Sequence, residues 1–257
     1  MIYDTNNIAI VQSKHYRSGQ ISDILKSFIC PVEPENADII VIIGGDGEFL
    51  RGLHQYMHLN IPFYGINTGT IGFLMNDFYK ESFLYDLQNA KSTYLYPLEI
   101  IAKDTSNNIY HSLAINDIVM SRQSNQTAKI VISIDNSVVM QELFADGILV
   151  ATSAGSSAYN LSAGGHIVPI ESKLLCITPI CPFRPRRWKG ALISNKLVIN
   201  LKNLEPEKRP TSVVADFKEF LDIKEVSISS NSLKYIELLF NPNFSFETKI
   251  MQEQFKL

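Results

Sequence analysis

The chain has 257 residues, of which 46% are apolar and 19% are charged, and its formal net charge at pH 7 is -3. This length fits one large or two modest domains with a buried core, and the charge argues against a general affinity for nucleic acids or anionic membranes. The sequence contains no apolar run near the roughly 18 residues of a membrane span, and its first residues, MIYDTNN, lack the apolar core of a signal peptide. We therefore expect a soluble, cytoplasmic protein in which Cys30, Cys176 and Cys181 are reduced thiols.

Strand-like and helix-like patterns alternate in the first third of the chain. Apolar runs predict strands at 8–11, 38–43 and 61–66, and apolar residues at helical spacing predict helices at 20–29 and 48–58. The second run contains five consecutive β-branched apolar residues, which is typical of a strand buried on both faces. This order predicts parallel pairing and a Rossmann-like three-layer α/β domain, with ligands at the carboxyl ends of its strands.

Two glycine-rich turns fall at that predicted edge. The first is Gly44-Gly45-Asp46-Gly47, where glycines permit a positive φ and a close ligand, and where the amides of the next helix can face an anion. A carboxylate among such amides suits metal binding or proton transfer, although Asp46 could instead cap the helix in an ordinary turn. The second turn, GINTGTIGFL at 65–74, either lets a ligand approach its backbone or is a structural loop.

The pattern changes after Pro97. Alternating or continuous β-branched runs predict strands at 98–103, 109–121, 128–134, 137–144, 190–201 and 211–230, which we interpret as an all-β, sandwich-like domain. Helical spacing returns at 244–256, and we expect this helix to pack back on the first domain. The expected organisation is therefore an α/β domain at 1–97, a β-rich domain at 98–237 and a returning C-terminal segment at 238–257.

Polar residues interrupt this β-rich half at two places. Asn116-Asp117 breaks an apolar strand, and because buried polar groups are costly unless paired, the two residues either end the strand or meet a ligand. The stretch 146–165, DGILVATSAGSSAYNLSAGG, contains a short predicted strand at 148–150. The hydroxyl side chains and glycines that follow this strand are unlike a core. This stretch could hold a sugar, an amide or a phosphate, with Tyr159 stacked on a base, or it could be a flexible surface loop.

A basic cluster lies within PFRPRRWK. Two prolines stiffen this stretch, and four cations occur in six of its residues, namely Arg184, Arg186, Arg187 and Lys189. They could grip phosphates, because guanidinium groups form paired hydrogen bonds with phosphate oxygens. A solvated face or an oligomer contact would account for them equally well.

Taken together, these stretches resemble the NAD kinase family. The resemblance rests on GGDG, on GINTGTIGFL, on Asn116-Asp117 and on the long motif at 146–165, which occur in the family's order and spacing. GGDG alone is unspecific, because lipid kinases and phosphofructokinases have similar turns, whereas the long motif separates the family from them. The segment ITPICPFRPRRW at 177–188 is similar to α-proteobacterial members.

The resemblance implies that ATP phosphorylates the 2′-hydroxyl of the adenosine ribose of NAD to give NADP, with Mg²⁺ or another divalent metal. It implies Asp46 as the general base, a β-rich domain that binds NAD, and a homodimer or homotetramer in which one subunit completes another's site. No protein ligand is expected for the metal. A lipid or sugar kinase with the same turn, or a non-catalytic NADP(H)-binding sensor, are the alternatives.

The resemblance also assigns binding residues. It implies that the adenosine half of NAD is fixed by Asn116, Ser157, Ala158 and Tyr159, and that Asp117 and Asp146 hold riboses or the nicotinamide amide. The further nucleotide contacts that it implies are Gly45, Gly47, Phe73, Ala154, Asn160 and Ser162.

Overall fold

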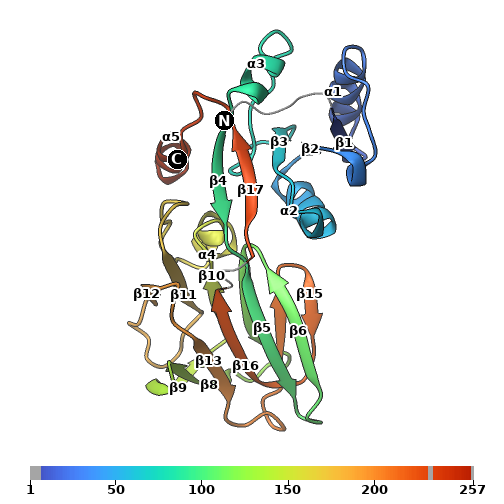
Figure 1. Cartoon of the computed structure of the whole chain (residues 1–257). Helices are drawn as coiled ribbons and strands as arrows, with labels where there is room; N and C mark the ends of the chain where they lie inside the picture. Colours follow the sequence, from blue (N-terminus) through green and yellow to red (C-terminus); the bar gives the residue numbers. More distant parts are fainter. Residues whose placement is uncertain (1–6, 231–233, 256–257) are drawn as a thin grey trace. The chain divides into compact units, whose positions relative to one another are not determined.

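The computed structural model describes residues 7–230 and 234–255 and divides the chain into two compact units (Figure 1). Unit 1 combines the two ends of the chain, residues 1–95 and 235–257, and unit 2 is the continuous middle, residues 96–234. Parts of the expected N-terminal region, β-rich domain and C-terminal helix fall on residues 1–6, 231–233 and 256–257, which lie outside the described residues.

Unit 1 is built on a mixed sheet in the order β1-β2-β3-β17-β4. Its strands are β1 Ile8–Gln12, β2 Ile39–Gly44, β3 Phe63–Asn67, β4 Lys91–Leu95 and β17 Ile236–Phe240. The pairs β1–β2, β2–β3 and β3–β17 are parallel, and β4 is antiparallel to β17. Figure 1 shows β17, from the end of the chain, lying beside β4, from its first half.

Helices cover both faces of this sheet. The unit contains α1 Tyr16–Lys26, α2 Asp46–Tyr56, α3 Phe83–Gln88, α5 Phe246–Gln254 and the short 3-10 helices η1 Pro34–Asn36 and η2 Met57–Leu59. Leu25 of α1 and Leu87 of α3 share a buried cluster with Val41 of β2. On the opposite face, α2 packs so closely that a Cβ at Gly52 would lie 2.5 Å from Ile42 Cδ1. The predicted three-layer arrangement is confirmed.

Unit 2 is a sandwich of two antiparallel sheets. The first, in the order β6-β5-β16-β13-β8-β9, contains β5 Leu98–Asp104, β6 Ile109–Ala114, β8 Ala128–Ile134, β9 Ser137–Ala145, β13 Ile199–Asn203 and β16 Ile223–Ser230. The second, in the order β12-β11-β10-β7-β14-β15, contains β7 Asp117–Arg122, β10 Gly147–Ala151, β11 Leu174–Ile180, β12 Ala191–Ser194, β14 Thr211–Ala215 and β15 Lys218–Phe220. The short helices η3 Gly155–Ser157 and α4 Tyr159–Ser162 follow β10.

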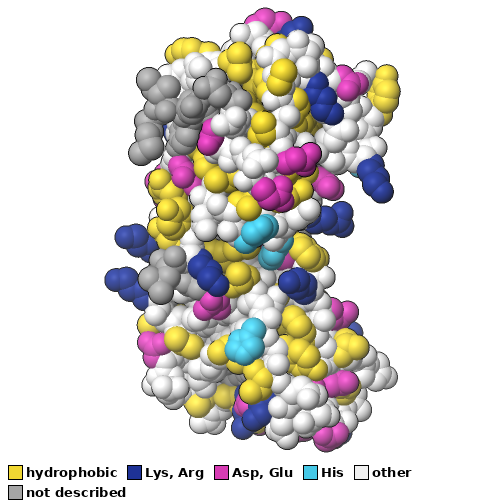
Figure 2. Space-filling model, turned by 45° about the vertical axis from the view of Figure 1, so that its right-hand side comes forward, with side chains coloured by type: hydrophobic (Ala, Val, Ile, Leu, Met, Phe, Trp, Pro, Cys, Tyr) yellow, Lys and Arg dark blue, Asp and Glu magenta, His cyan; other side chains and the backbone are white. Residues whose placement is uncertain are grey.

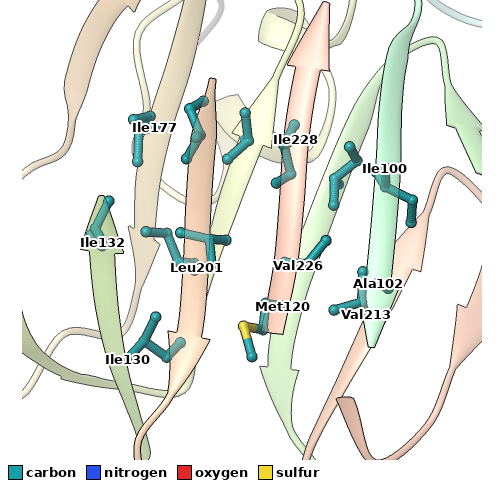
Figure 3. Close-up of a cluster of buried hydrophobic side chains, with 14 of the residues drawn as sticks. Ile100, Ala102, Met120, Ile130, Ile132, Ile177, Leu201, Val213, Val226 and Ile228 are labelled. Atoms are coloured by element: carbon teal, nitrogen blue, oxygen red, sulfur yellow. The ribbon is translucent and has the colours of Figure 1, made fainter. Parts of the chain in front are cut away.

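The two sheets of unit 2 enclose one apolar core (Figure 3). Ile100 and Ile228 come from the first sheet, and Met120 and Ile177 come from the second. Within β5 the buried positions alternate, because successive side chains of a strand point to opposite faces. The buried positions of β5 thus lie on the inner face of this sandwich, and the all-β prediction is confirmed.

Several boundaries differ from those predicted. The expected strand 109–121 is two strands, because the chain leaves one sheet at Ala114 and enters the other at Asp117. The elements that were not predicted are the helices α3 and α4, the strands β4, β11 and β17, and the short 3-10 helices. The C-terminal helix does return to unit 1, where the ring of Phe246 lies 4.8 Å from that of Phe240, at the end of β17.

The surface carries charges of both signs. Figure 2 shows Lys and Arg side chains interspersed with Asp and Glu side chains over the drawn face. Among the described helices, none is long and apolar enough to cross a membrane.

Candidate functional site

The candidate residues form two groups, and the first surrounds the turn after β2. β2 ends at Gly44 and α2 begins at Asp46, with Gly45 as its N-cap in extended conformation. No glycine of this turn has a positive φ, so that expectation was wrong. Gly44 is instead required by packing, since a Cβ there would lie 2.8 Å from Glu48 Cβ, whereas a Cβ at Gly45 or Gly47 would meet no atom within 4 Å. The backbone at the start of α2 is therefore open.

The Asp46 carboxylate is held by the second glycine turn. Its Oδ2 accepts a hydrogen bond from the Phe73 amide and its Oδ1 accepts one from the Leu74 amide, both at 3.1 Å. The side chain does not cap α2, which removes the alternative role of a plain capping residue. Two amides on one carboxylate fix its orientation and leave further lone pairs on both oxygens.

The second turn has a conformation that requires glycine. Gly72 has a φ of +63°, and a Cβ there would lie 2.4 Å from Asn67 Cγ. The Thr68 amide donates to the Gly44 carbonyl at 2.7 Å, which ties the two turns together. Phe73 itself is buried, so its amide is placed at Asp46 while its ring packs in the interior.

A chain of hydroxyls lies at the same edge of the sheet. Ser13 Oγ and Ser18 Oγ are 2.7 Å apart, and Ser18 Oγ lies 3.1 Å from Thr68 Oγ1. Ser13 and Ser18 were not identified from the sequence. The available signal was that Ser13 directly follows the first strand and Ser18 lies in the first turn of the next helix, at the edge where parallel strands place their ligands.

The second group is in unit 2 and centres on Asn116-Asp117. The amides of Ile115, Asn116 and Asp117 all donate to the Asp216 carboxylate, at 2.7, 2.9 and 3.2 Å. Asp216 follows β14 and was not identified from the sequence, where an Asp after an apolar strand was the only signal. Because these amides donate to a side chain, the strand pairing is interrupted here, and β6 and β7 are separate strands.

The side chains of Asp117 and Asn116 are in unusual environments. Burial, together with the nearby charge of Asp216, raises the pKa of the Asp117 carboxyl to about 7. Asn116 Oδ1 is buried, and the described part of the chain offers it no hydrogen-bond donor. An unpaired buried acceptor is costly, so this oxygen is suited to a donor on a ligand.

The hydroxyl-rich stretch after β10 is anchored on the same residues. Thr152 donates its amide to the Asn116 carbonyl at 2.9 Å and its hydroxyl to the Ile115 carbonyl at 2.7 Å. A Cβ at Gly155 would lie 2.1 Å from the Asn116 carbonyl oxygen, so glycine is required there. The expectation that this stretch is unlike a core was wrong for part of it, because Thr152, Ser156 and Asn160 are buried with their polar groups paired. It is not a loosely held surface loop.

The predicted contacts in this stretch divide into outer and inner residues. Ser157 and Ala158 are partly exposed, and Tyr159 and Ser162 are exposed, so these four can meet a ligand. Ala154 is buried. Asn160 is fully buried, where it donates to the Ser156 and His166 carbonyls and accepts from the Thr178 hydroxyl. Ala154 and Asn160 therefore support the stretch from inside.

Asp146 is not brought together with the other residues. It precedes β10, whose first residue pairs with Ser121, whereas Asp117 pairs with the last residue of β10. The strand spacing separates them by about 15 Å within the subunit. Asp146 Oδ1 accepts a hydrogen bond from Arg122 Nε at 2.6 Å.

The basic cluster lies at the Asp146 end of this sheet. The Asp146 amide donates to the Ile180 carbonyl, and the segment that follows is joined by backbone hydrogen bonds to Phe144 of β9. The guanidinium carbons of Arg184 and Arg186 lie 5.6 and 4.9 Å from the centroid of the Phe183 ring. The cations of the cluster are exposed.

Comparison with known proteins identifies the family. The model of the ATP-NAD kinase N-terminal domain matches residues 4–89, and that of the ATP-NAD kinase C-terminal domain matches residues 115–236. The chain belongs to the NAD kinase family. Its curated relatives include the NAD kinases of Rickettsia canadensis (strain McKiel), 50% identical, and Rickettsia bellii (strain OSU 85-389), 48% identical. Each match covers 97% of this chain and 98% of the relative, and the predicted α-proteobacterial type is confirmed.

Solved structures of the family share the fold. An NAD kinase from Archaeoglobus fulgidus in complex with ATP is 25% identical, with a TM-score of 0.74 over 96% of this chain and 98% of that one. Yeast NADH kinase complexed with NADH is 21% identical, with a TM-score of 0.78 over 98% of this chain and 88% of that one. The NAD kinase fold predicted from the sequence is thus confirmed.

Proposed function

We propose that this member of the NAD kinase family transfers the γ-phosphoryl group of ATP to the 2′-hydroxyl of the adenosine ribose of NAD, with Asp46 as the general base. The conversion of NAD to NADP with ATP follows from full-length similarity to NAD kinases. The role of Asp46 rests on one observation, its carboxylate held by the Phe73 and Leu74 amides beside the open start of α2.

Asp46 supplies the proton acceptor for this transfer. The ribose hydroxyl gives its proton to a carboxylate oxygen as the hydroxyl oxygen bonds to the γ-phosphorus. The bond from the γ-phosphorus to the bridging oxygen breaks, and ADP leaves. The two backbone amides hold the carboxylate in one orientation throughout, so no reorganisation is needed when the proton moves.

The start of α2 faces the phosphate chain in this proposal. The open backbone at Gly45 and Gly47 lets phosphate oxygens approach the first amides of the helix. A helix end stabilises an anion by only about 0.3–1 kcal/mol. A divalent metal is therefore part of the proposal, and when bound it would neutralise charge on the transferring phosphoryl group.

The residues present fit a metal that is carried mainly by the substrate, because the Asp46 carboxylate keeps lone pairs beside the open start of α2, where the phosphates are placed in this proposal. Mg²⁺ suits such a site, because it keeps several waters and binds phosphate oxygens with few protein ligands.

The unit 2 residues supply the NAD contacts. Asn116 Oδ1, which is buried without a donor, is placed to accept a hydrogen bond from an amino or hydroxyl group of the adenosine. Ser157 and Ala158 offer partly exposed polar groups, and Tyr159 offers an exposed ring that can stack on a base. Asp117 holds a ribose or the nicotinamide amide. Asp216 fixes the backbone of Asn116 and Asp117.

The activity is tested with a coupled assay. Purified protein is incubated with NAD, ATP and Mg²⁺, and newly formed NADP is detected with an NADP-specific dehydrogenase. We expect a signal that requires all three additions. No signal, together with tight NADP binding by calorimetry, would instead identify a non-catalytic sensor.

Replacing Tyr159 by alanine is expected to weaken NAD binding by about 2- to 10-fold, the loss of one stacking contact. ATP binding should stay unchanged, because Tyr159 is assigned to the NAD base alone. Isothermal titration with each nucleotide measures both constants. Tyr85→Ala is the matched control, because Tyr85 is also an exposed tyrosine and lies on α3, in the other unit. Equal losses for NAD and ATP would contradict the assignment.

A homo-oligomer, dimer or tetramer, is also part of the proposal, with Asp146 of one subunit contacting NAD on another. Its support is the position of Asp146 at the far end of β10 from Asp117. Co-expressed Asp46→Asn and Asp146→Asn subunits should then recover about a quarter of the activity, since half of the random dimers contain one intact site. If every mixture stayed as inactive as its parents, Asp146 would not act across subunits. The free cysteines suit the cytoplasmic location that we also propose.

A further inference from the structure

Lys249 on the C-terminal helix α5 reaches the turn that holds Asp46. Its Nζ donates hydrogen bonds to the carbonyl oxygens of Gly72 and, at 2.7 Å, Met75. The same ammonium group lies 4.6 Å from the centroid of the Phe244 ring. Burial lowers the pKa of Lys249, while the negative charges of Asp77 and Asp46 oppose this effect. A partly buried charge thus points at peptide carbonyls close to the proposed base.

The two carbonyls flank the two amides that bind Asp46. The Gly72 carbonyl and the Phe73 amide belong to one peptide group, whose oxygen accepts from Lys249 and whose N–H donates to Asp46 Oδ2. A cation at a peptide oxygen polarises the group and strengthens the hydrogen bond that its N–H donates. The left-handed backbone at Gly72 turns this peptide toward both partners.

We infer that Lys249 is a positioning residue for the phosphoryl transfer, acting on Asp46 through the Gly72–Phe73 peptide and the turn around it. This inference rests on the proposed role of Asp46 as the general base. It gives the C-terminal helix a part in catalysis, although Lys249 is 177 residues from Gly72 in sequence.

The first test is Lys249→Met, which keeps the apolar stem and removes the charge and both hydrogen bonds. We expect kcat to fall about 10- to 100-fold, the usual cost of losing a residue that orients a reacting group, with KM for NAD and for ATP changed less than about twofold. Lys249→Arg should restore most of kcat, and Lys249→Gln, a shorter uncharged donor, should give an intermediate value. Lys91→Met is the matched control. Lys91 Nζ also donates a hydrogen bond that holds the C-terminal segment, to the Pro242 carbonyl, but it does not contact the turn that binds Asp46.

The second test is a double-mutant cycle with Asp46→Asn. If Lys249 acts through Asp46, Lys249→Met should have less than about a twofold further effect on the residual kcat of Asp46→Asn. A loss of the same size in both backgrounds would identify a general structural role and overturn the inference. Unchanged kcat in folded Lys249→Met would overturn it too. If Lys249→Met fails to fold, Lys249→Gln replaces it in the same double-mutant cycle. Near-normal turnover of Asp46→Asn itself would instead contradict the proposed function.

Discussion

Asp46→Asn is expected to lower kcat by about 10²- to 10⁴-fold while NAD still binds. The amide cannot accept the ribose proton. Its NH₂ group would also face one of the two backbone amides that now donate to the carboxylate, so one hydrogen bond is lost as well. The coupled assay gives kcat, and isothermal titration gives the NAD dissociation constant.

The control for this variant is Asp23→Asn, an exposed aspartate on α1 in the same unit, which should leave kcat unchanged. Turnover of Asp46→Asn within about threefold of the native rate would remove Asp46 from the role of general base. Loss of NAD binding in proportion to kcat would show that Asp46 acts in binding instead.

Asp117→Asn is expected to stabilise the fold at alkaline pH and to leave it unchanged near pH 4. The pKa of Asp117 is raised from its ordinary value of 3.8 to about 7 in the folded protein, so the folded state holds this proton more tightly than the unfolded state. The free energy of unfolding therefore falls as pH rises from about 4 to 7, by up to about 4 kcal/mol at 1.36 kcal/mol per unit. Asparagine, which is close in shape to the protonated carboxyl, removes this cost.

Denaturant unfolding of both proteins between pH 4.5 and 8.5 measures the difference, with the fluorescence of Trp188, the single tryptophan, as the probe. Asp104→Asn provides a control of opposite sign, because hydrogen bonds from Asn108 lower the pKa of Asp104. That variant should lose stability at neutral pH and approach the native protein only as pH falls below the ordinary pKa of 3.8, so its unfolding is also measured below about pH 4. A difference between Asp117→Asn and the native protein that does not change with pH would contradict the prediction.

The sequence was most informative where local pattern decides the structure. The β-branched run of β2 could be recognised as fully buried, and the pattern at 98–103 as the strand that is now β5. β17 could not be placed in the same way. Its residues resemble any short apolar strand, and its position between β3 and β4 depends on pairing with residues more than 140 positions away.

The functional residues also differ in whether local sequence pattern or tertiary structure reveals them. Asp46 stood out because a strand, glycines and a helix surround it in sequence. Asp216 and Lys249 did not, since each acts on backbone that lies 99 or more residues away, and only tertiary structure brings the partners together. Asn160 was expected at a ligand, but a motif does not distinguish a side chain that faces the ligand from one that supports the loop from within.

The insertion of β17 between β3 and β4 also sets an order of events during synthesis. Unit 2 is continuous in sequence, so all of its strands have been synthesised before β17 is made. Until then β3 has no neighbour on one side and β4 has none at all, because both pair with β17. The sheet that carries Asp46 is therefore completed last, by the final strand of the chain, although its first three strands are the first to be made.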